Sequence, residues 1–359
     1  IMLWTRLQSY SNFVRNGEVY FRGNDPWYHF RETTYIMQNW PSRNPFDVWT
    51  GFPEGTQAGQ FGTLWDHIMV VSTWLTKPIM GSTEEVMLIM APLAGALVAL
   101  PTYVIARRFV ERPAALGGAA TLALLPGTFF SYSLVGFPDH TAAEVLFQSL
   151  AVLGVLGALG VAEREKPVWE LVVDRDWTAL KRPVGVAALG GVALGAYIWT
   201  WQPGILVVGF TGIYLAVKLT SDVYHGKSPE PIAFAGAIAL TVAGLMQVIP
   251  LDTFRFAVSE YSYLQIVLPL GVAAGAVFLA WLARFWEARD LETSTYPLTV
   301  GGLIAASAAV VWLGLPSLWS TLTGSLLNTV GFSASAGART IGEAQPPLQN
   351  AAFSDFVIS

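Results

Sequence analysis

Eight stretches of mostly apolar residues follow one another between residues 86 and 315. Each is close to the roughly 20 residues that an α-helix needs to cross a bilayer. Their interiors contain no Asp, Lys or Arg, and Glu144 lies near the end of one of them. Gly and Ala are frequent, for example over residues 185–196, and such small residues let helices pack closely in a membrane. The pattern predicts an all-α polytopic membrane protein, with spans over 86–106, 114–134, 141–161, 184–201, 203–219, 231–251, 262–283 and 296–315.

Two long polar segments flank the predicted spans. The first carries Asp25-Pro26, a dipeptide typical of a helix start, and a stretch over 63–76 that predicts a helix lying at the membrane interface. Connections much longer than about 15 residues are usually functional. We therefore expect three regions: a first external loop region over 1–83, a transmembrane bundle over 84–315 and a last external loop over 316–359.

The basic residues indicate how the chain is oriented. If residues 5–83 lie outside and the sides alternate through the eight spans, the inside loops hold 12 of the 20 Lys and Arg residues. The outside loops after the first span hold only Arg255 and Arg339. Cytoplasmic loops carry an excess of Lys and Arg. The asymmetry predicts a multi-pass protein of the cell membrane whose first and last loops are external.

Composition agrees with this pattern and excludes several function classes. The 359 residues are 53% hydrophobic and 13% charged, against about a quarter charged in soluble proteins, and the mean hydropathy is +0.48. Cysteine is absent, which excludes disulfides, cysteine metal sites and a thiol nucleophile. The net charge of −5 excludes a broadly basic surface, so no nucleic-acid partner is expected.

Three acidic residues fall on the same predicted external side although they are far apart in the sequence. Asp25 lies in the first loop, Asp139 directly before the span over 141–161, and Glu343 in the last loop. Carboxylate oxygens are the ligands that hard divalent cations such as Mg²⁺ and Mn²⁺ prefer. Together these residues indicate an external acidic cluster that could hold a metal ion against a phosphate.

Each of these residues also has a purely structural interpretation. Asp25 would serve as a helix N-cap before Pro26, and Asp139 would cap its own span, where Thr141 and Glu144 have capping-box spacing. Glu343 alone resembles an ordinary loop residue. Among the histidines, His140 is a weak ligand candidate, and the others are interpreted as interfacial or loop residues: His29, His67 and His225.

The sequences around the three acids are GNDPWYHFR (23–31), PDHT (138–141) and TIGE (340–343). In their order along the chain and in the side of the membrane on which they are predicted to lie, these segments resemble the acidic motifs of the STT3 family of oligosaccharyltransferase catalytic subunits. The resemblance is strongest to its archaeal AglB branch. This resemblance implies a GT-C-type transmembrane helix bundle. Thr141 stands where the family has an acid or a histidine. Glu260, in AVSEY, also resembles the last motif but lies one external loop too early.

The resemblance further implies a reaction: transfer of a glycan from a dolichol-linked phosphate or pyrophosphate to the Asn amide of N-x-Ser/Thr in an acceptor polypeptide. It implies a Mn²⁺ or Mg²⁺ ion bound by Asp25, Asp139, Glu343 and, through water, Thr141. Asp25 and Glu343 would also bind the acceptor amide and so act in catalysis. Further spans and a soluble C-terminal domain would lie outside this chain.

Two other functions remain open. Another lipid-sugar-dependent glycosyltransferase, similar to the protein O-mannosyltransferases, would also use an Asp in the first loop but would not need TIGE. A lipid-sugar flippase or transporter would place ionisable groups near the bilayer midplane. The interiors of the predicted spans contain no such groups apart from Glu144 near one end, which favours the transferases.

Overall fold

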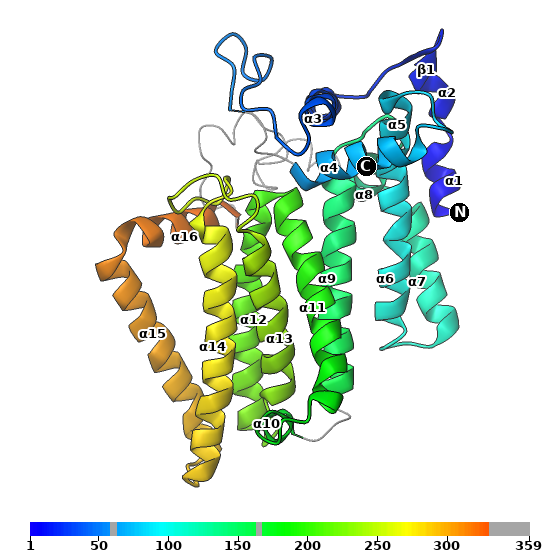
Figure 1. Ribbon diagram of the computed structural model, residues 1–359. Helices are drawn as coiled ribbons and strands as arrows, with labels where there is room; N and C mark the ends of the chain where they lie inside the picture. Colours follow the sequence, from blue (N-terminus) through cyan, green and yellow to red (C-terminus); the bar gives the residue numbers. More distant parts are fainter. Residues whose placement is uncertain (58–62, 163–166, 330–359) are drawn as a thin grey trace, which may run out of the picture.

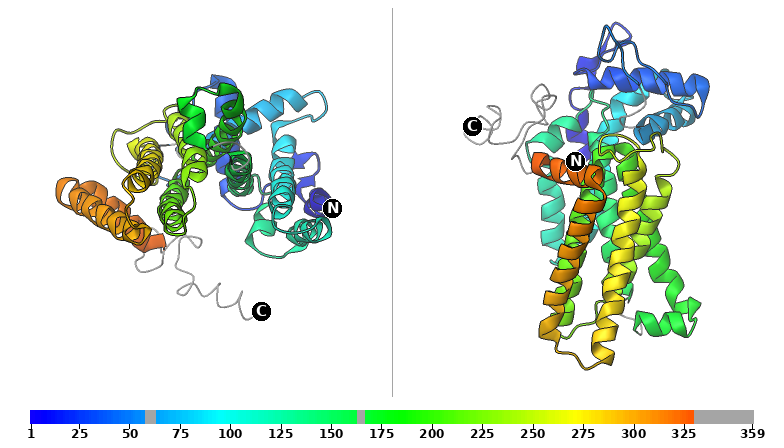
Figure 2. Two further views of the ribbon diagram at one scale, coloured as in Figure 1. Left: turned by 90° about the horizontal axis from the view of Figure 1, so that it is seen from below. Right: turned by 90° about the vertical axis from the view of Figure 1, so that its left-hand side faces the viewer.

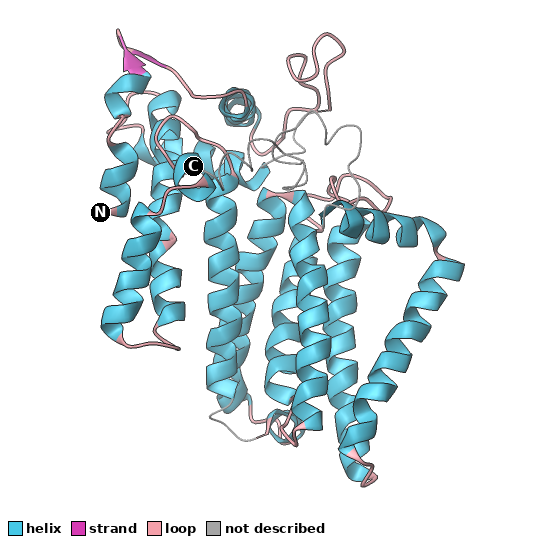
Figure 3. Cartoon of the chain, turned by 180° about the vertical axis from the view of Figure 1, so that it is seen from behind, coloured by secondary structure: helices cyan, strands magenta, loops and turns pink. Residues whose placement is uncertain are grey.

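The computed structural model describes residues 1–57, 63–162 and 167–329. Helices dominate this part of the chain, and a small strand pair lies near the N-terminus (Figure 3). Long helices run side by side, with α3 and α4 across one end of the bundle and α10 at the other (Figure 1). The prediction of an all-α polytopic fold is confirmed.

The N-terminal segment leads into the helix that carries the first acidic motif. It contains a tight hairpin in which Val14 pairs with Val19, and Asn16 and Gly17 both have positive φ, as the favoured two-residue turn requires. The elements of this region are α1 (Met2–Leu7), α2 (Tyr10–Phe13), β1 (Val14–Arg15), β2 (Glu18–Val19), α3 (Asp25–Asn39) and α4 (Thr63–Thr76). The expected helix over 63–76 is thus present with those bounds.

The bundle follows from residue 83 onward. Its α-helices are α5 (Thr83–Leu97), α6 (Ala99–Ala106), α7 (Arg112–Leu124), α8 (Thr128–Tyr132), α9 (Thr141–Ala162), α10 (Val168–Val173), α11 (Trp177–Thr200), α12 (Ile205–Tyr224), α13 (Glu230–Met246), α14 (Tyr263–Ala288), α15 (Tyr296–Gly314) and α16 (Pro316–Thr329). Two 3₁₀ turns, η1 (Gln202–Gly204) and η2 (Thr293–Thr295), precede α12 and α15. Viewed from below, α15 lies at the outer edge (Figure 2).

Six helical segments of the described part are long and apolar enough to cross a membrane: Thr83–Ala106, Thr141–Ala162, Trp177–Thr200, Gln202–Tyr224, Tyr263–Ala288 and Thr293–Gly314. Two of the eight predicted spans are shorter helices in the structure. The stretch over 114–134 is interrupted, because Pro126 favours an extended Leu125 and Gly127 has φ +138°. The stretch over 231–251 forms the 17-residue helix α13, which ends before Pro250.

Small residues bring the central helices into close contact, as the sequence predicts. A Cβ atom added to Gly154 on α9 would lie 2.3 Å from the Cα of Gly190 on α11. A Cβ atom on Gly191 would lie 2.4 Å from the carbonyl oxygen of Ala239 on α13. Any larger side chain would push these backbones apart. This close packing fixes α9, whose first residues carry the second acidic motif.

Candidate functional site

Helix α3 presents the first motif. It begins at Asp25, with Asn24 at the N-cap position and Pro26 in the first turn, so the interpretation of Asp25 as the N-cap is wrong. The side chain of Asp25 is exposed. Residues four apart lie on the same face of an α-helix, so Asp25 and His29 project from one side of α3. This face turns toward the start of α9.

His29 is buried and connects three segments of the chain. Its Nδ1 lies 2.7 Å from Asp66 Oδ1 on α4, and its Nε2 lies 3.1 Å from Asp139 Oδ1 and 3.1 Å from His140 Nδ1. The interpretation of His29 as an interfacial or loop residue is therefore wrong. Burial by itself lowers the pKa of His29, but the carboxylates of Asp66 and Asp139 outweigh it and raise the pKa to about 10.

Asp139 uses its two oxygens differently. Oδ1 faces the two imidazoles, at 2.8 Å from His140 Nδ1, whereas Oδ2 accepts hydrogen bonds from the hydroxyl of Thr141 and, at 3.3 Å, from its backbone N–H. Asp139 therefore holds the first residue of α9 through Oδ2 and contributes to the site through Oδ1. Burial opposes ionisation, but the two histidines hold the pKa of Asp139 well below its usual range.

Neighbouring side chains fix the remaining geometry. His140 Nε2 lies 3.3 Å from Glu144 Oε1, one turn along α9, and the carboxylate of Asp139 raises the pKa of His140 against the effect of burial. Trp65 on α4 donates its indole N–H to the carbonyl of Pro138 at 3.3 Å. Helices α3, α4 and α9 thus hold the site from three sides.

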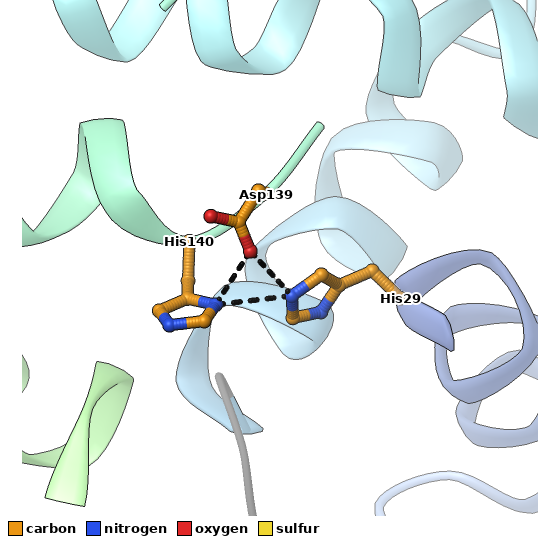
Figure 4. Close-up of side chains that lie close together, drawn as sticks. All are labelled: His29, Asp139 and His140. Atoms are coloured by element: carbon orange, nitrogen blue, oxygen red, sulfur yellow. Dashed lines mark hydrogen bonds and ion pairs between the residues drawn. The ribbon is translucent and has the colours of Figure 1, made fainter. Parts of the chain in front are cut away.

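His29, Asp139 and His140, hereafter the triad, could hold a metal ion. Their ligating atoms all lie within 4.8 Å of one another, and Figure 4 shows the two imidazoles and the carboxylate converging on a common point. One carboxylate oxygen with two imidazole nitrogens is a donor set that suits Zn²⁺, Mn²⁺ or Fe²⁺. The chemistry of these residues therefore fits a divalent metal.

The structure brings together some of the predicted site residues. Asp139 and Thr141 are in direct contact. Asp25 lies one turn before His29 on α3 and is not a member of the triad. Glu343 lies outside the described residues.

Sequence reasoning missed His29 and Asp66. The four-residue spacing from Asp25 to His29 would have placed His29 on the same helix face. Asp66, an acid within the apolar helix α4, gave no comparable indication of its partner, because 37 residues separate it from His29.

Comparison with known proteins identifies the family. The model for the N-terminal part of oligosaccharyl transferase STT3 matches residues 3–341, nearly the whole chain. The chain belongs to the STT3 family. This STT3 chain is 48% identical over 351 residues to the dolichyl-monophosphooligosaccharide–protein glycotransferase AglB of Haloferax volcanii, covering 97% of the chain and 33% of the relative. The chain spans about a third of the length of that curated relative.

Solved structures share the fold of this STT3 chain. The AglB oligosaccharyltransferase of Archaeoglobus fulgidus, in complex with an inhibitory peptide and a dolichol-phosphate, superposes with a TM-score of 0.79 at 22% identity, covering 95% of this chain and 38% of that one. The A. fulgidus enzyme in complex with Zn and sulfate gives a TM-score of 0.73 at 23% identity, covering 92% and 41%. The GT-C-type architecture expected from the motifs is thus confirmed at the level of the fold.

Proposed function

We propose that this protein is the catalytic subunit of an oligosaccharyltransferase, which transfers a glycan from a dolichol-linked phosphate to the Asn amide of N-x-Ser/Thr sequons. The observation that carries the proposal is the contact between His29 and Asp139, which lie 110 residues apart. It joins the GNDPWYHFR and PDHT segments, two of the three family motifs, in one site. The site lies at the end of the bundle that the charge distribution assigns to the external side.

The named relatives support this choice of donor and acceptor. The Haloferax relative is named for a dolichyl-monophosphooligosaccharide donor, and the Archaeoglobus structure contains a dolichol-phosphate and a peptide. For the present chain, a lipid-linked phosphate donor, a peptide acceptor and the surrounding bilayer are the corresponding partners. The 48% identity to the Haloferax protein supports a monophosphate rather than a pyrophosphate donor.

Two chemical problems define what the site must do. The amide nitrogen of Asn is a poor nucleophile, because its lone pair is delocalised into the carbonyl group. Carboxylates that accept its N–H bonds position it for attack and stabilise the charge that develops there. Asp25 is exposed on the face of α3 that carries His29, and we assign this role to Asp25 together with Glu343.

The second problem is the negative charge on the leaving phosphate. A bound divalent cation, which we propose to be Mn²⁺ or Mg²⁺ in keeping with the family motifs, would supply Lewis-acid neutralisation of that charge. Asp139 would hold the cation with Asp25 and Glu343. Thr141 holds Asp139 by donating its hydroxyl to Oδ2, and a water on that hydroxyl would occupy the remaining position.

A transfer assay on the full-length protein tests the proposal. Purified enzyme, lipid-linked oligosaccharide and an N-x-Thr peptide are combined with Mn²⁺, and glycopeptide is quantified. Asp25→Asn and Asp139→Asn keep side-chain size but remove charge, and each should lower transfer about 100-fold or more. The matched control is Asp290→Asn, an exposed residue after α14 at the opposite end of the bundle. Wild-type protein that gives no glycopeptide would refute the function, and transfer unaffected by both site variants would refute the roles assigned to Asp25 and Asp139.

A further inference from the structure

We propose that Arg22 is a positioning residue, which sets the place of Asp139 relative to Asp25. Arg22 precedes Asp25 by three residues, and it contacts the segment that carries Asp139. This segment, residues 125–140, runs from α7 through α8 to α9 and is called the connector below. Arg22 acts through the backbone that carries the two acids rather than on the substrates. The proposal deepens the proposed function and rests on it for the roles of Asp25 and Asp139.

Arg22 is joined to the connector by its backbone and by its side chain. Its backbone N–H donates to the carbonyl oxygen of Gly136 at 2.7 Å. Its Nη2 donates to the carbonyl oxygen and to the hydroxyl of Ser131, each at 3.1 Å. The guanidinium carbon lies 5.2 Å from the centre of the Phe137 ring, within the range of a cation–π contact. One residue thus holds the connector at both ends of the stretch from 131 to 137.

Glycines on both segments allow them to approach closely. Gly23 has φ +87°, and a Cβ atom added to it would lie 3.2 Å from Cε2 of Phe137. Gly136 has φ +86°, and a Cβ atom there would lie 2.4 Å from the ring of Phe13. Both backbone conformations would strain a residue with a side chain. The ring of Phe137, two residues before Asp139, therefore packs directly against the backbone that leads into α3.

A second arginine, Arg6 on α1, attaches the connector to the bundle. Its buried Nε donates to Ser133 Oγ at 2.8 Å, and its carbonyl oxygen accepts the N–H of Val135 at 3.1 Å. Gly95 on α5 makes room for this contact, since a Cβ atom on it would lie 2.5 Å from Cβ of Ser133. The contacts of Arg22 join the same connector to the start of α3 instead. Removal of the Arg22 side chain should therefore leave the attachment to the bundle intact.

The effect of Arg22 on position should exceed its effect on stability. Its side chain is exposed, and a hydrogen bond or cation–π contact at an exposed site contributes about 1 kcal/mol. Catalysis depends more steeply on geometry, because a misplacement of about 1 Å can cost about 100-fold in rate. Loss of the Arg22 side chain should therefore slow transfer in a protein that remains folded.

Direct binding of the donor is the competing role for Arg22. An arginine binds a phosphate through two of its N–H groups, and loss of such a contact would raise the KM for the lipid-linked donor. A residue that places Asp25 and Asp139 affects interactions made in the transition state, and its loss lowers kcat instead. The two roles are therefore separated by which constant changes.

Steady-state transfer by the full-length protein separates these roles, with lipid-linked oligosaccharide and an N-x-Thr peptide as substrates. Arg22→Gln should lower kcat about 10-fold or more and keep the donor KM within about twofold of the wild type. Arg22→Lys retains a cation for Phe137 and a donor for Ser131, so it should recover most of kcat. The matched control is Arg15→Gln, an exposed arginine of β1 whose Nε donates to the carbonyl of Asn12 at 3.2 Å, and it should leave both constants unchanged. A raised donor KM with kcat unchanged would overturn the proposal.

A double-mutant cycle tests the contact through which Arg22 acts. Phe137→Leu keeps an apolar side chain but removes the ring that faces the guanidinium. If both residues act through this contact, the loss of kcat in the double variant should be smaller than the product of the two single losses. Losses that multiply fully would show that Arg22 and Phe137 act independently and would contradict the proposal.

Hydrogen exchange measures the positioning without glycan transfer. Amides of residues 131–138 should exchange about 10-fold faster in Arg22→Gln than in the wild type, because the connector has lost one of its attachments. Amides of α14 should exchange at the wild-type rate. If the wild type gives no glycopeptide, the proposed function falls and the exchange rates alone decide the role of Arg22. If the wild type transfers glycan and Arg22→Gln matches it in kcat and in exchange, the positioning role falls and the function stands.

Discussion

At the scale of single residues, the site depends on how Asp139 divides its two oxygens. Oδ2 is held by the hydroxyl and backbone N–H of Thr141, and Oδ1 faces His29 and His140. Because each oxygen has its own partners, the carboxylate cannot rotate without losing several contacts. A carboxylate fixed in this way is pre-organised, which lowers the cost of binding a cation or a substrate at Oδ1.

Glu343→Gln provides a test of the last motif at this scale. The change keeps the side-chain size but removes a charge that we assign to the acceptor amide, so glycan transfer should fall about 100-fold or more, while lipid-linked donor binding should change much less. Glu260→Gln is the matched control, because Glu260 resembles the motif but its carboxylate is engaged by Arg255, with Oε2 3.0 Å from Nε. Glu260→Gln should leave glycan transfer nearly unchanged in the same peptide assay. Loss of transfer in Glu260→Gln with retention in Glu343→Gln would show that the motif was assigned to the wrong loop.

Local sequence could predict the acids of the site but not their partners. Asp25 and Asp139 stand out because they are isolated charges beside apolar or helix-starting segments. His29 and Asp66 do not, since a buried histidine is recognisable only when the residues that surround it are known. Their partners lie 37 and 110 residues away in sequence, and such contacts depend on the packing of three helices rather than on local pattern.

At the scale of elements, α3 connects the site to the rest of the first loop. His29 belongs to the triad, while Arg31, on the same helix, pairs with the buried Asp47 and so anchors the loop that follows. The buried residues Glu32 and Ile36 continue the inner face of the helix. The acidic side chain of Glu32 is unusual on such a face, because burying a carboxylate costs free energy unless it is neutralised.

Glu32→Gln should therefore stabilise the protein in a pH-dependent manner. Burial, with the nearby charge of Asp66, raises the pKa of Glu32 from 4.5 to about 7. The folded state then binds a proton more tightly than the unfolded state, so stability falls as pH rises from 4.5 to 7 and stays low above it. The resulting loss in the free energy of unfolding is on the order of 3 kcal/mol. We expect the thermal midpoint of Glu32→Gln to exceed that of the wild type by several degrees at pH 8.5.

The difference in thermal midpoint between Glu32→Gln and the wild type should shrink as the pH is lowered. At pH 5 the wild-type side chain is largely protonated in the folded protein and the two midpoints should approach each other, as measured by differential scanning fluorimetry in detergent. Glu54→Gln, an exposed change in the same loop region, is the matched control and should show no such pH dependence. A constant difference between Glu32→Gln and wild type from pH 5 to 8.5 would contradict the assigned pKa.

The boundaries of the helices show where the apolar pattern of the sequence is sufficient to predict the structure and where it is not. The helix over 63–76 and, to within one residue, the start of α3 follow from local sequence, because capping residues and periodicity act over a single turn. The interrupted stretch over 114–134 does not follow from hydropathy, which counts Pro126 and Gly127 as ordinary members of an apolar run. Backbone conformation decides there, since Leu125 is extended and Gly127 has φ +138°.

At the scale of the whole molecule, the two ends of the bundle have different character. The site, with α3 and α4, lies at one end, whereas α10 and the connections from α6 to α7 and from α12 to α13 lie at the other (Figures 1 and 2). The second end carries the basic residues that the sequence assigns to the inside, among them Arg107, Arg108 and Lys227. The loop asymmetry predicts that this second end is the cytoplasmic one.

Cysteine labelling can test this orientation directly, because the chain has no native cysteine to interfere. Phe52→Cys is exposed in the first loop and Lys227→Cys is exposed at the opposite end, while Ser335→Cys lies in the predicted last loop. In intact cells, a membrane-impermeant maleimide should modify residues 52 and 335 and should reach residue 227 only after the membrane is permeabilised. If residues 52 and 335 were modified from opposite sides, Asp25 and Glu343 could not share one site, and the shared role that we assign to them would be wrong.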